Sequence, residues 1–434
     1  MVNVAKVFST LGNPNSLVPL AVKDISATAG MTAGSFITGK EEGQDRFIDE
    51  AGTEIIWLLG IPAFKGIFNN TVFRAMGLDY HFDARNLKDK EVLAKIKEYA
   101  PTDQVKSNIE KIISKEKLFK NTAMAKFFVA TALTVGSYIG LTRFKQNYTE
   151  KKIRANLIAE YEQQKAQEKN KKNESKEVSF KGLGSTIETF AFSPVKNMWI
   201  LDGFITGERL KDSRSPQEFV GYGIKEASTL FFMYCAGDQI QKMLEKHAKE
   251  KYNKSIGLDA RVLEDGFLKK AFEDGSIQKS LDEFRAANTS KANLYEFLHK
   301  NPDNLVVKTA KMSDAIHMYK EPQGLFKAAK ITDKIDTRKY IDFEDIESIN
   351  KKIEELYKQF NSAKSKGESS EKFFAGVKKL KRNSILTNIG TCIFALGVVT
   401  PAIMLAKRLA GKDDAEFQTK KEIRAQLIKE GIIA

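Results

Sequence analysis

The sequence predicts an all-α, internally duplicated membrane protein with two homologous units, each holding one weak and one strong apolar helix. A soluble helical insertion is expected in the second unit. Two apolar runs have about the length of a membrane-spanning helix. Short motifs recur in the same order along both halves of the chain, and the polar stretches have helical rather than alternating periodicity.

Composition sets the first limits on the class of protein. The chain has 434 residues, with 70 Lys and Arg against 56 Asp and Glu, a formal net charge of +14. A basic excess favours an acidic partner, such as nucleic acid or anionic lipid. The two cysteines, Cys235 and Cys392, lie in apolar runs, so no disulfide framework is expected.

Three pairs of matching motifs indicate the duplication. Phe-Ile-Thr-Gly occurs at 36–39 and 204–207, Asp-Ala-Arg at 83–85 and 259–261, and Ile-Arg-Ala at 153–155 and 423–425. A period near two hundred residues indicates two fused homologous units rather than a solenoid. The predicted first unit is therefore residues 1–160, and the second is residues 182–434.

The segments outside the matched motifs are polar. Residues 161–181 are almost wholly Glu, Gln, Lys, Asn and Ser, which is typical of a solvated, flexible linker. Residues 275–376 have no counterpart in the first unit. Their apolar residues recur at helical spacing around 346–360, so they are predicted to be an inserted soluble helical module.

The second apolar run of each unit is the strong one. Residues 385–406 carry no charge, are flanked by Lys and Arg, and reach the ~20 residues needed to cross a ~30 Å hydrocarbon core. Residues 122–142 are similar but include Lys126, whose side chain can extend to the membrane interface.

The first apolar run of each unit is weaker. Residues 55–64 and 227–237 are too short to span alone, so each is an interfacial, re-entrant or buried helix. If both runs of each unit cross, the matched polar elements lie on one side of the membrane, so four embedded helices are favoured over two. Lys and Arg at both ends leave the orientation open.

Four charged residues are the candidate site residues. Arg85 and Arg261 recur in the Asp-Ala-Arg elements, and an arginine fork binds a phosphate or lipid headgroup. The alternative is a helix cap with an ion pair. Glu54 and Glu226 are candidates for membrane-embedded carboxylates, with a helix-start acid as the alternative.

Motifs for catalysis, metal binding or cofactor binding are not apparent. His81 lies between carboxylates, but the second unit has no matching histidine, so no metal site is predicted. The segment 221–223, Gly-Tyr-Gly, lacks the third glycine of a dinucleotide loop. We therefore expect no cofactor and no catalytic residues, and an enzyme is the less favoured class.

These observations lead to an expected function, a non-enzymatic integral membrane scaffold or envelope-organising protein. The alternatives are a small-solute or ion transporter built on the repeat, and a lipid-modifying enzyme. Expected partners are the lipid membrane, through anionic headgroups, and a protein bound by residues 275–376. No nucleic-acid partner is expected, because the basic charge is diffuse. Continuous apolar runs favour an inner or plasma membrane over an outer-membrane barrel.

Overall fold

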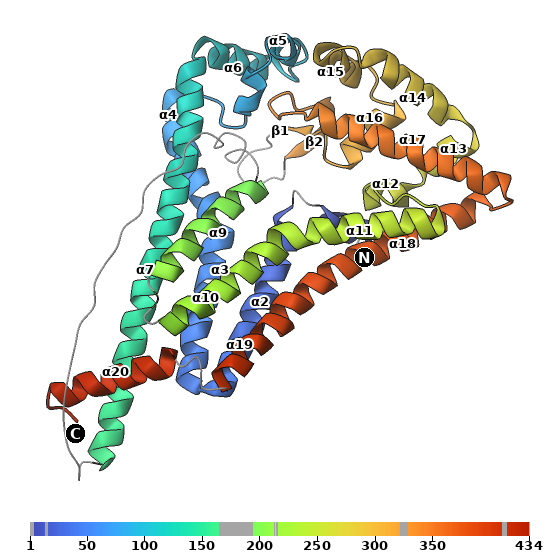
Figure 1. Cartoon of the computed structure of the whole chain (residues 1–434). Helices are drawn as coiled ribbons and strands as arrows, with labels where there is room; N and C mark the ends of the chain where they lie inside the picture. Colours follow the sequence, from blue (N-terminus) through green and yellow to red (C-terminus); the bar gives the residue numbers. More distant parts are fainter. Residues whose placement is uncertain are drawn as a thin grey trace. The chain divides into compact units, whose positions relative to one another are not determined.

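The computed structural model describes residues 4–13, 16–164, 194–211, 213, 216–321, 329–409 and 415–433. Of these described residues 82% are helical and 3% are in strands, so the all-α prediction is confirmed. Residues 165–181 of the predicted linker lie outside the described residues. The chain forms two compact units (Figure 1). Unit 1 comprises Met1–Pro14, Ile67–Lys126 and Gln239–Asn388, and unit 2 comprises Asn15–Gly66, Phe127–Asp238 and Ile389–Ala434.

Each compact unit takes segments from both halves of the chain, and four unit boundaries fall inside helices α3, α7, α11 and α18. The elements of unit 2 are α2 (Leu17–Thr38), α3 (Lys40–Phe68), α7 (Glu116–Gln164), α9 (Pro194–Lys211), α10 (Pro216–Leu230), the π-helix η3 (Phe231–Cys235), the π-helix η4 (Ala395–Val399), α19 (Thr400–Leu409) and α20 (Ala415–Lys429).

Unit 1 is built from shorter helices and one strand pair. Its elements are α1 (Val4–Gly12), η1 (Asn69–Phe73), α4 (Arg74–Met76), η2 (Ala84–Leu87), α5 (Lys90–Glu98), α6 (Asp103–Ser114), α11 (Ala236–Tyr252), α12 (Ala260–Asp265), α13 (Phe267–Glu273), α14 (Ser276–Ala287), α15 (Lys291–Lys300), α16 (Leu305–Met312), β1 (Met318–Glu321), β2 (Lys330–Ile335), α17 (Phe343–Ser365) and α18 (Ser370–Phe394).

The helices of unit 1 begin at capping residues and bury one apolar face. Side chains of Thr102, Ser290 and Asp342 accept hydrogen bonds from backbone N–H groups at the starts of α6, α15 and α17. Buried residues then recur every three or four positions, as Ile346, Ile349, Ile353, Leu356 and Phe360 do in α17. The amphipathic faces therefore meet in one apolar core.

One part of the predicted helical module is not helical. β1 and β2 pair antiparallel, with Met318 opposite Ile335 and Lys320 opposite Ile331. The β-branched and aromatic residues around this pair suit a pleated surface better than a helix. The segment is too short to outweigh the helical periodicity of the surrounding hundred residues, so sequence reasoning missed it.

The core of unit 2 is apolar and built around large side chains. Trp57 of α3, Tyr138 of α7 and Leu201 of α9 are almost fully buried in one cluster with Leu396 of η4. Beside it, α2 crosses η4 at very close range, because Gly30 offers no side chain to the carbonyl oxygen of Gly397.

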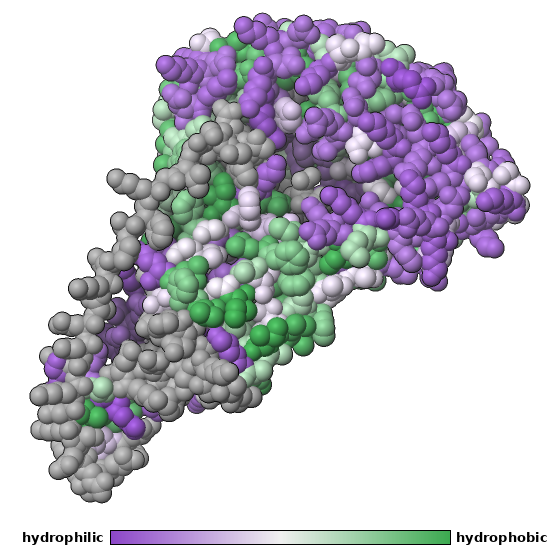
Figure 2. All heavy atoms as spheres, in the orientation of Figure 1, coloured by the Kyte–Doolittle hydropathy of each residue, from purple (hydrophilic) through white to green (hydrophobic). Residues whose placement is uncertain are grey.

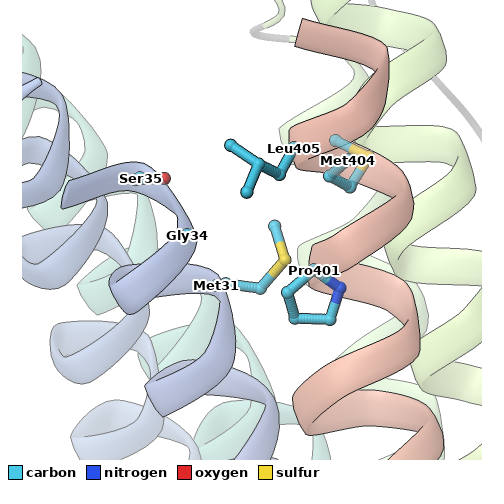
Figure 3. A pocket seen from close by; sticks show the side chains of 6 residues that line it. All are labelled: Met31, Gly34, Ser35, Pro401, Met404 and Leu405. Carbon is cyan, nitrogen blue, oxygen red and sulfur yellow. The ribbon is translucent and has the colours of Figure 1, made fainter. Parts of the chain in front are cut away.

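Pro401 explains why that carbonyl is available. A proline has no N–H, so the carbonyl four residues earlier, that of Gly397, has no helical donor. The chain forms the π-helix η4 just before this proline. Next to the crossing lies a small pocket between α2 and α19, lined by Met31, Gly34, Ser35, Pro401, Met404 and Leu405 (Figure 3).

Three helical runs of the described residues are long and apolar enough to cross a membrane: Gly43–Met76, Glu116–Ala159 and Ser370–Lys407. The last two contain the predicted strong runs, and the first contains the weak run 55–64. The other weak run, 227–237, is helical but is not among the three, since Lys225, Glu226 and Asp238 lie close to it. By length and composition the count is three, between the two and four considered from the sequence.

Candidate functional site in unit 2

Helix α3 carries a row of charged residues on the face that packs inside unit 2. Arg46, Glu50 and Glu54 are four residues apart, as are Asp45 and Asp49, so helical geometry places them on neighbouring lines of one face. All five are buried, with at most 8% of each residue exposed. Buried charges are rare unless paired, so their partners define the site.

The partners are three basic residues from three other helices. Lys145 of α7 has its Nζ 3.7 Å from Asp45 Oδ2 and 3.6 Å from Asp49 Oδ1. Arg209 of α9 has its Nη2 3.6 Å from both Asp49 Oδ2 and Glu50 Oε2. Lys225 of α10 has its Nζ 2.7 Å from Glu50 Oε1.

Arg209 is the centre of this arrangement. It forms an ion pair with Glu226 of α10, and its Nε donates to the hydroxyl of Tyr138 at 3.0 Å. Its Nη2 donates to Thr53 Oγ1 at 3.1 Å. Glu226 is also 3.2 Å from Lys225 Nζ. We call these residues the ion-pair network; its members are Asp45, Arg46, Asp49, Glu50, Lys145, Arg209, Lys225 and Glu226.

The ion-pair network is charge-balanced, with four carboxylates and four basic groups. The attraction between opposite charges offsets part of the free-energy cost of removing them from water, but only while every partner is in place. Four helices, α3, α7, α9 and α10, are therefore held in one register. This arrangement can fix a helix bundle in position, and it offers no free nucleophile or acid.

A second group of ionisable residues lies beside the network and has a different character. Asp24 of α2, Glu54 of α3 and Asp202 of α9 act on one another electrostatically. The hydroxyl of Tyr234 in η3 donates a hydrogen bond to Asp202. We call Asp24, Glu54 and Asp202 the carboxyl cluster.

Lysine does not neutralise the carboxyl cluster directly. Lys23 neighbours Asp24, but its Nζ donates to the backbone carbonyls of Phe232, at 3.2 Å, and Met233, at 3.4 Å. Both carbonyls belong to η3, where the π-helical turn departs from regular α-helical hydrogen bonding. Both carboxylate oxygens of Glu54 are buried and have no hydrogen-bond partner.

The predicted acidic residues are thus both in unit 2 but in different environments. Glu226 is a fully paired member of the ion-pair network, and Glu54 belongs to the carboxyl cluster. Glu50 links the carboxyl cluster to the ion-pair network, because it interacts electrostatically with Glu54 and forms an ion pair with Lys225.

The predicted arginines are in unit 1. Arg85 donates from Nη2 to Asp83 Oδ2 at 2.7 Å, and its guanidinium lies 4.4 Å from the ring centre of Tyr340. Arg261 donates to Asp259 Oδ2 at 3.1 Å and to Asp314 Oδ2 at 2.7 Å. In both elements the aspartate also caps a helix start. Each arginine fork therefore already faces carboxylate oxygens.

The same local geometry occurs a third time, at Arg338, and was not predicted from the sequence. Arg338 donates from its backbone N–H to Asp336 Oδ1 at 3.1 Å and from Nη2 to Asp336 Oδ2 at 2.9 Å. The same Asp-x-Arg spacing was the available signal. The third copy shows that the Asp-x-Arg spacing is enough to produce this cap. The shared cap is therefore weak support for the duplication.

Sequence reasoning also missed most of the ion-pair network and two members of the carboxyl cluster. The signal was the four-residue spacing of charges in α3, a helix whose remaining length is apolar enough to span a membrane. Arg209, Lys225 and Asp202 carry no such local signal, since only the fold brings them to α3.

In unit 1, His299 is a half-buried titratable group. The ring of His299 stacks between Tyr99, at 4.6 Å, and Tyr295, at 4.9 Å between ring centres. Burial, assisted by Lys311, lowers the pKa of His299 from 6.5 to about 4. Its Nε2 and the hydroxyl of Tyr295 have no hydrogen-bond partner.

In the part of the chain that the structure describes, three or more His, Cys, Asp or Glu residues nowhere come together in a way that could hold a metal ion. Comparison with protein-family models, with curated proteins and with solved structures found no match to this chain.

Proposed function

We propose that the chain is a non-enzymatic integral membrane protein, a scaffold or envelope-organising component whose unit 2 lies in the bilayer. One observation carries the proposal. In the most apolar windows of the three candidate spans, only 17%, 28% and 33% of residues are buried. Apolar side chains that are not buried within a protein require an apolar surrounding, which lipid supplies.

The distribution of side chains supports this assignment. Ile55 and Leu59 of α3, Phe144 of α7 and Phe394 of α18 are each about 60% exposed. Figure 2 shows hydrophobic residues gathered on the visible face around α10 and α19. Unit 2 therefore exposes large apolar side chains and buries an ion-pair network beside its apolar core, which a water-soluble bundle does not do.

The ion-pair network supports a scaffold in particular. A neutral set of interlocked charges holds helix register, and register is what a structural component must keep. Anionic headgroups near Arg85 and Arg261, and a protein bound by residues 275–376, are the proposed partners. An inner or plasma membrane is the proposed location, since the apolar runs are helical.

The proposal includes the internal duplication. Its support is the collinear order of the three motif pairs. The lipid-modifying enzyme rests on the two Asp-Ala-Arg elements, and the arginine forks of these elements face their own carboxylates, so it is not carried forward.

Alkaline carbonate extraction of membranes from expressing cells tests the membrane assignment. Spanning helices stay with the lipid because their exposed apolar faces have no place in water. We expect the chain in the pellet with a marker protein that spans the membrane. Release into the supernatant together with a peripheral marker would rule out the assignment.

Ion or small-solute transport is the second candidate, favoured by the unpaired Glu54 inside a unit proposed to be in lipid. The test is purified protein in sealed vesicles, with an internal pH-sensitive dye and a potassium gradient. Dye responses faster than in protein-free vesicles, and slower for Glu54→Gln, are expected. Equal responses in all three samples would exclude proton transport.

A further inference from the structure

The carboxyl cluster has chemistry that a scaffold does not require. Asp24, Glu54 and Asp202 come from three different helices and share one site in unit 2. Fully ionised, they would place three negative charges together. Like charges at such range inside a protein are strongly unfavourable, and the usual remedy is that one carboxyl group keeps a proton.

The charged groups that face the carboxyl cluster do not remove this excess. From α2 comes Lys23, which is committed to the carbonyls of η3. Lys225 of α10 and Arg209 of α9 act on Asp24 from a distance while they are paired within the ion-pair network. The remaining facing groups are acidic or neutral: Glu50, Glu226, Tyr138, Tyr234 and, beside Lys23, Cys392.

The pairing of Asp24 with Glu54 is the decisive contact. The two side chains lie within hydrogen-bonding reach of each other. An ionised carboxylate has only acceptors, so two of them cannot form a hydrogen bond. Glu54 is 8% exposed and both of its oxygens lack a donor. One proton on either group supplies the missing donor.

Trp57 lies beside the same site. It is 1% exposed, and its indole N–H faces Asp202 and the hydroxyl of Tyr234. It does not donate to Glu54, whose two carboxylate oxygens have no hydrogen-bond partner. The pair of Asp24 and Glu54 therefore still lacks a donor.

Asp202 has a different role from the pair. Its carboxylate has a hydrogen-bond donor, the hydroxyl group of Tyr234, which the pair lacks. Asp24 and Asp202 are half-buried, whereas Glu54 is buried. Protons therefore reach the pair from the Asp24 side.

We propose that Asp24 and Glu54 form a proton-binding site that takes one proton from water and holds it in a shared O–H···O hydrogen bond. The reaction is the protonation of one carboxylate, and the bond that forms is one O–H bond. Loss of the proton to water reverses it. The inference requires only the fold of unit 2, so it stands or falls separately from the membrane assignment.

Infrared difference spectra of the purified full chain between neutral and strongly alkaline pH test the site directly. A protonated carboxyl group has a carbonyl band that an ionised one lacks. We expect this band at neutral pH, its loss at alkaline pH, and its absence from Asp24→Asn and from Glu54→Gln. The matched control is Glu208→Gln, which changes a carboxylate of α9 that pairs with Lys211.

Trp57 supplies a second measurement, which needs neither of the two pair variants. The chain has two tryptophans, so Trp199→Phe leaves Trp57 as the only emitter. Its emission should change in a single one-proton transition over the pH range in which the infrared band disappears.

Four results would overturn the proposal: a flat pH profile of Trp57 emission, no carboxylic-acid band at neutral pH, a band that persists in both pair variants, or a transition abolished by sodium but not by choline at equal ionic strength. The last result would mean that the pair binds a metal cation in place of the proton. Carbonate extraction does not bear on any of the four, so failure of one proposal leaves the other testable.

Discussion

At the scale of single residues, unit 2 reverses the usual placement of charge. Arg209 is 6% exposed and contacts two helices besides its own through Asp49, Glu50 and Glu226. Its burial is tolerated because each guanidinium nitrogen has an oxygen partner: Tyr138, Thr53 or a carboxylate. Removing such a residue is strongly destabilising, because the carboxylates that paired with it stay buried without an opposite charge.

Arg209→Ala is therefore expected to lower the free energy of unfolding by about 3–5 kcal/mol. Thermal or denaturant unfolding of the detergent-solubilised full chain measures it. The matched control is Arg154→Ala, which breaks the half-exposed pair with Glu430 and should cost under about 1 kcal/mol. Equal losses for the two variants would contradict a buried role for Arg209.

His299 gives unit 1 a defined pH dependence. Its pKa is about 4 in the folded chain and 6.5 when unfolded, so the unfolded state binds the proton first. The stability that His299 contributes is therefore fully present above pH 6.5 and is lost as the pH drops towards 4. The loss is about 2 kcal/mol once the partial exposure of the ring is allowed for.

Amide hydrogen exchange in α15 measures this loss locally. His299→Phe keeps the stack between Tyr99 and Tyr295 but cannot titrate, so protection should become less dependent on pH. His247→Phe changes an exposed ring and should leave the dependence as in the parent. An unchanged profile in His299→Phe would assign the pH effect to other groups.

At the scale of elements, the crossing of α2 and η4 depends on one missing side chain. A Cβ at Gly30 would lie 2.1 Å from the carbonyl oxygen of Gly397 and 2.9 Å from Pro401 Cγ. Both neighbours are rigid, because one is backbone and the other is a proline ring. The two helices can only separate to admit the extra atom.

Gly30→Ala should therefore destabilise unit 2 by about 1–3 kcal/mol, even though alanine is the better helix former. Gly136→Ala in α7 is the control, since a Cβ there meets no atom within 4 Å. It should be neutral or stabilise by up to about 1 kcal/mol. Melting temperatures of the two variants decide the matter, and a Gly30→Ala protein at least as stable as the parent would show that the crossing relaxes freely.

At the scale of the whole molecule, the basic excess and the apolar faces act together. A net charge of +14 attracts an anionic surface, and that attraction weakens as salt increases. Arg85 and Arg261 keep about a quarter of their side-chain surface exposed while paired with their own aspartates.

The variant Arg85→Ala with Arg261→Ala is expected to bind vesicles containing phosphatidylserine more weakly at low salt, with binding to neutral vesicles unchanged. The double lysine variant keeps the charge and should bind nearly as well. Because both arginines also brace helix caps, circular dichroism of each variant serves as the folding control. Undiminished affinity of a folded alanine variant would remove these residues from the proposed lipid contact.

The sequence predicted the helical class, because the apolar residues recur at helical spacing. It also predicted the strong apolar runs, because a run of about twenty uncharged residues has the length of a membrane-spanning helix. It selected Glu54 and Glu226 as membrane-embedded carboxylates, with helix-start acids as the alternative, but it did not predict what surrounds them. Their true partners, such as Asp24 and Arg209, are far away in the chain, and no local pattern encodes such pairs. The strands β1 and β2 were missed because they are short, and the duplication stays a prediction.

The π-helix η3 has a consequence for how this unit can change over generations. A π-helical turn contains one residue more than the α-helical turn it replaces, so a single-codon deletion within 231–235 would restore regular helix. The helix on either side would keep nearly the same phase, because five π-helical residues turn about as far as four α-helical ones. The side chains inside the turn would change direction, Tyr234 with its hydrogen bond to Asp202 among them, and the carbonyls that accept from Lys23 would enter regular helical hydrogen bonds. One inserted amino acid is thus enough to create, or to erase, the surroundings of the carboxyl cluster.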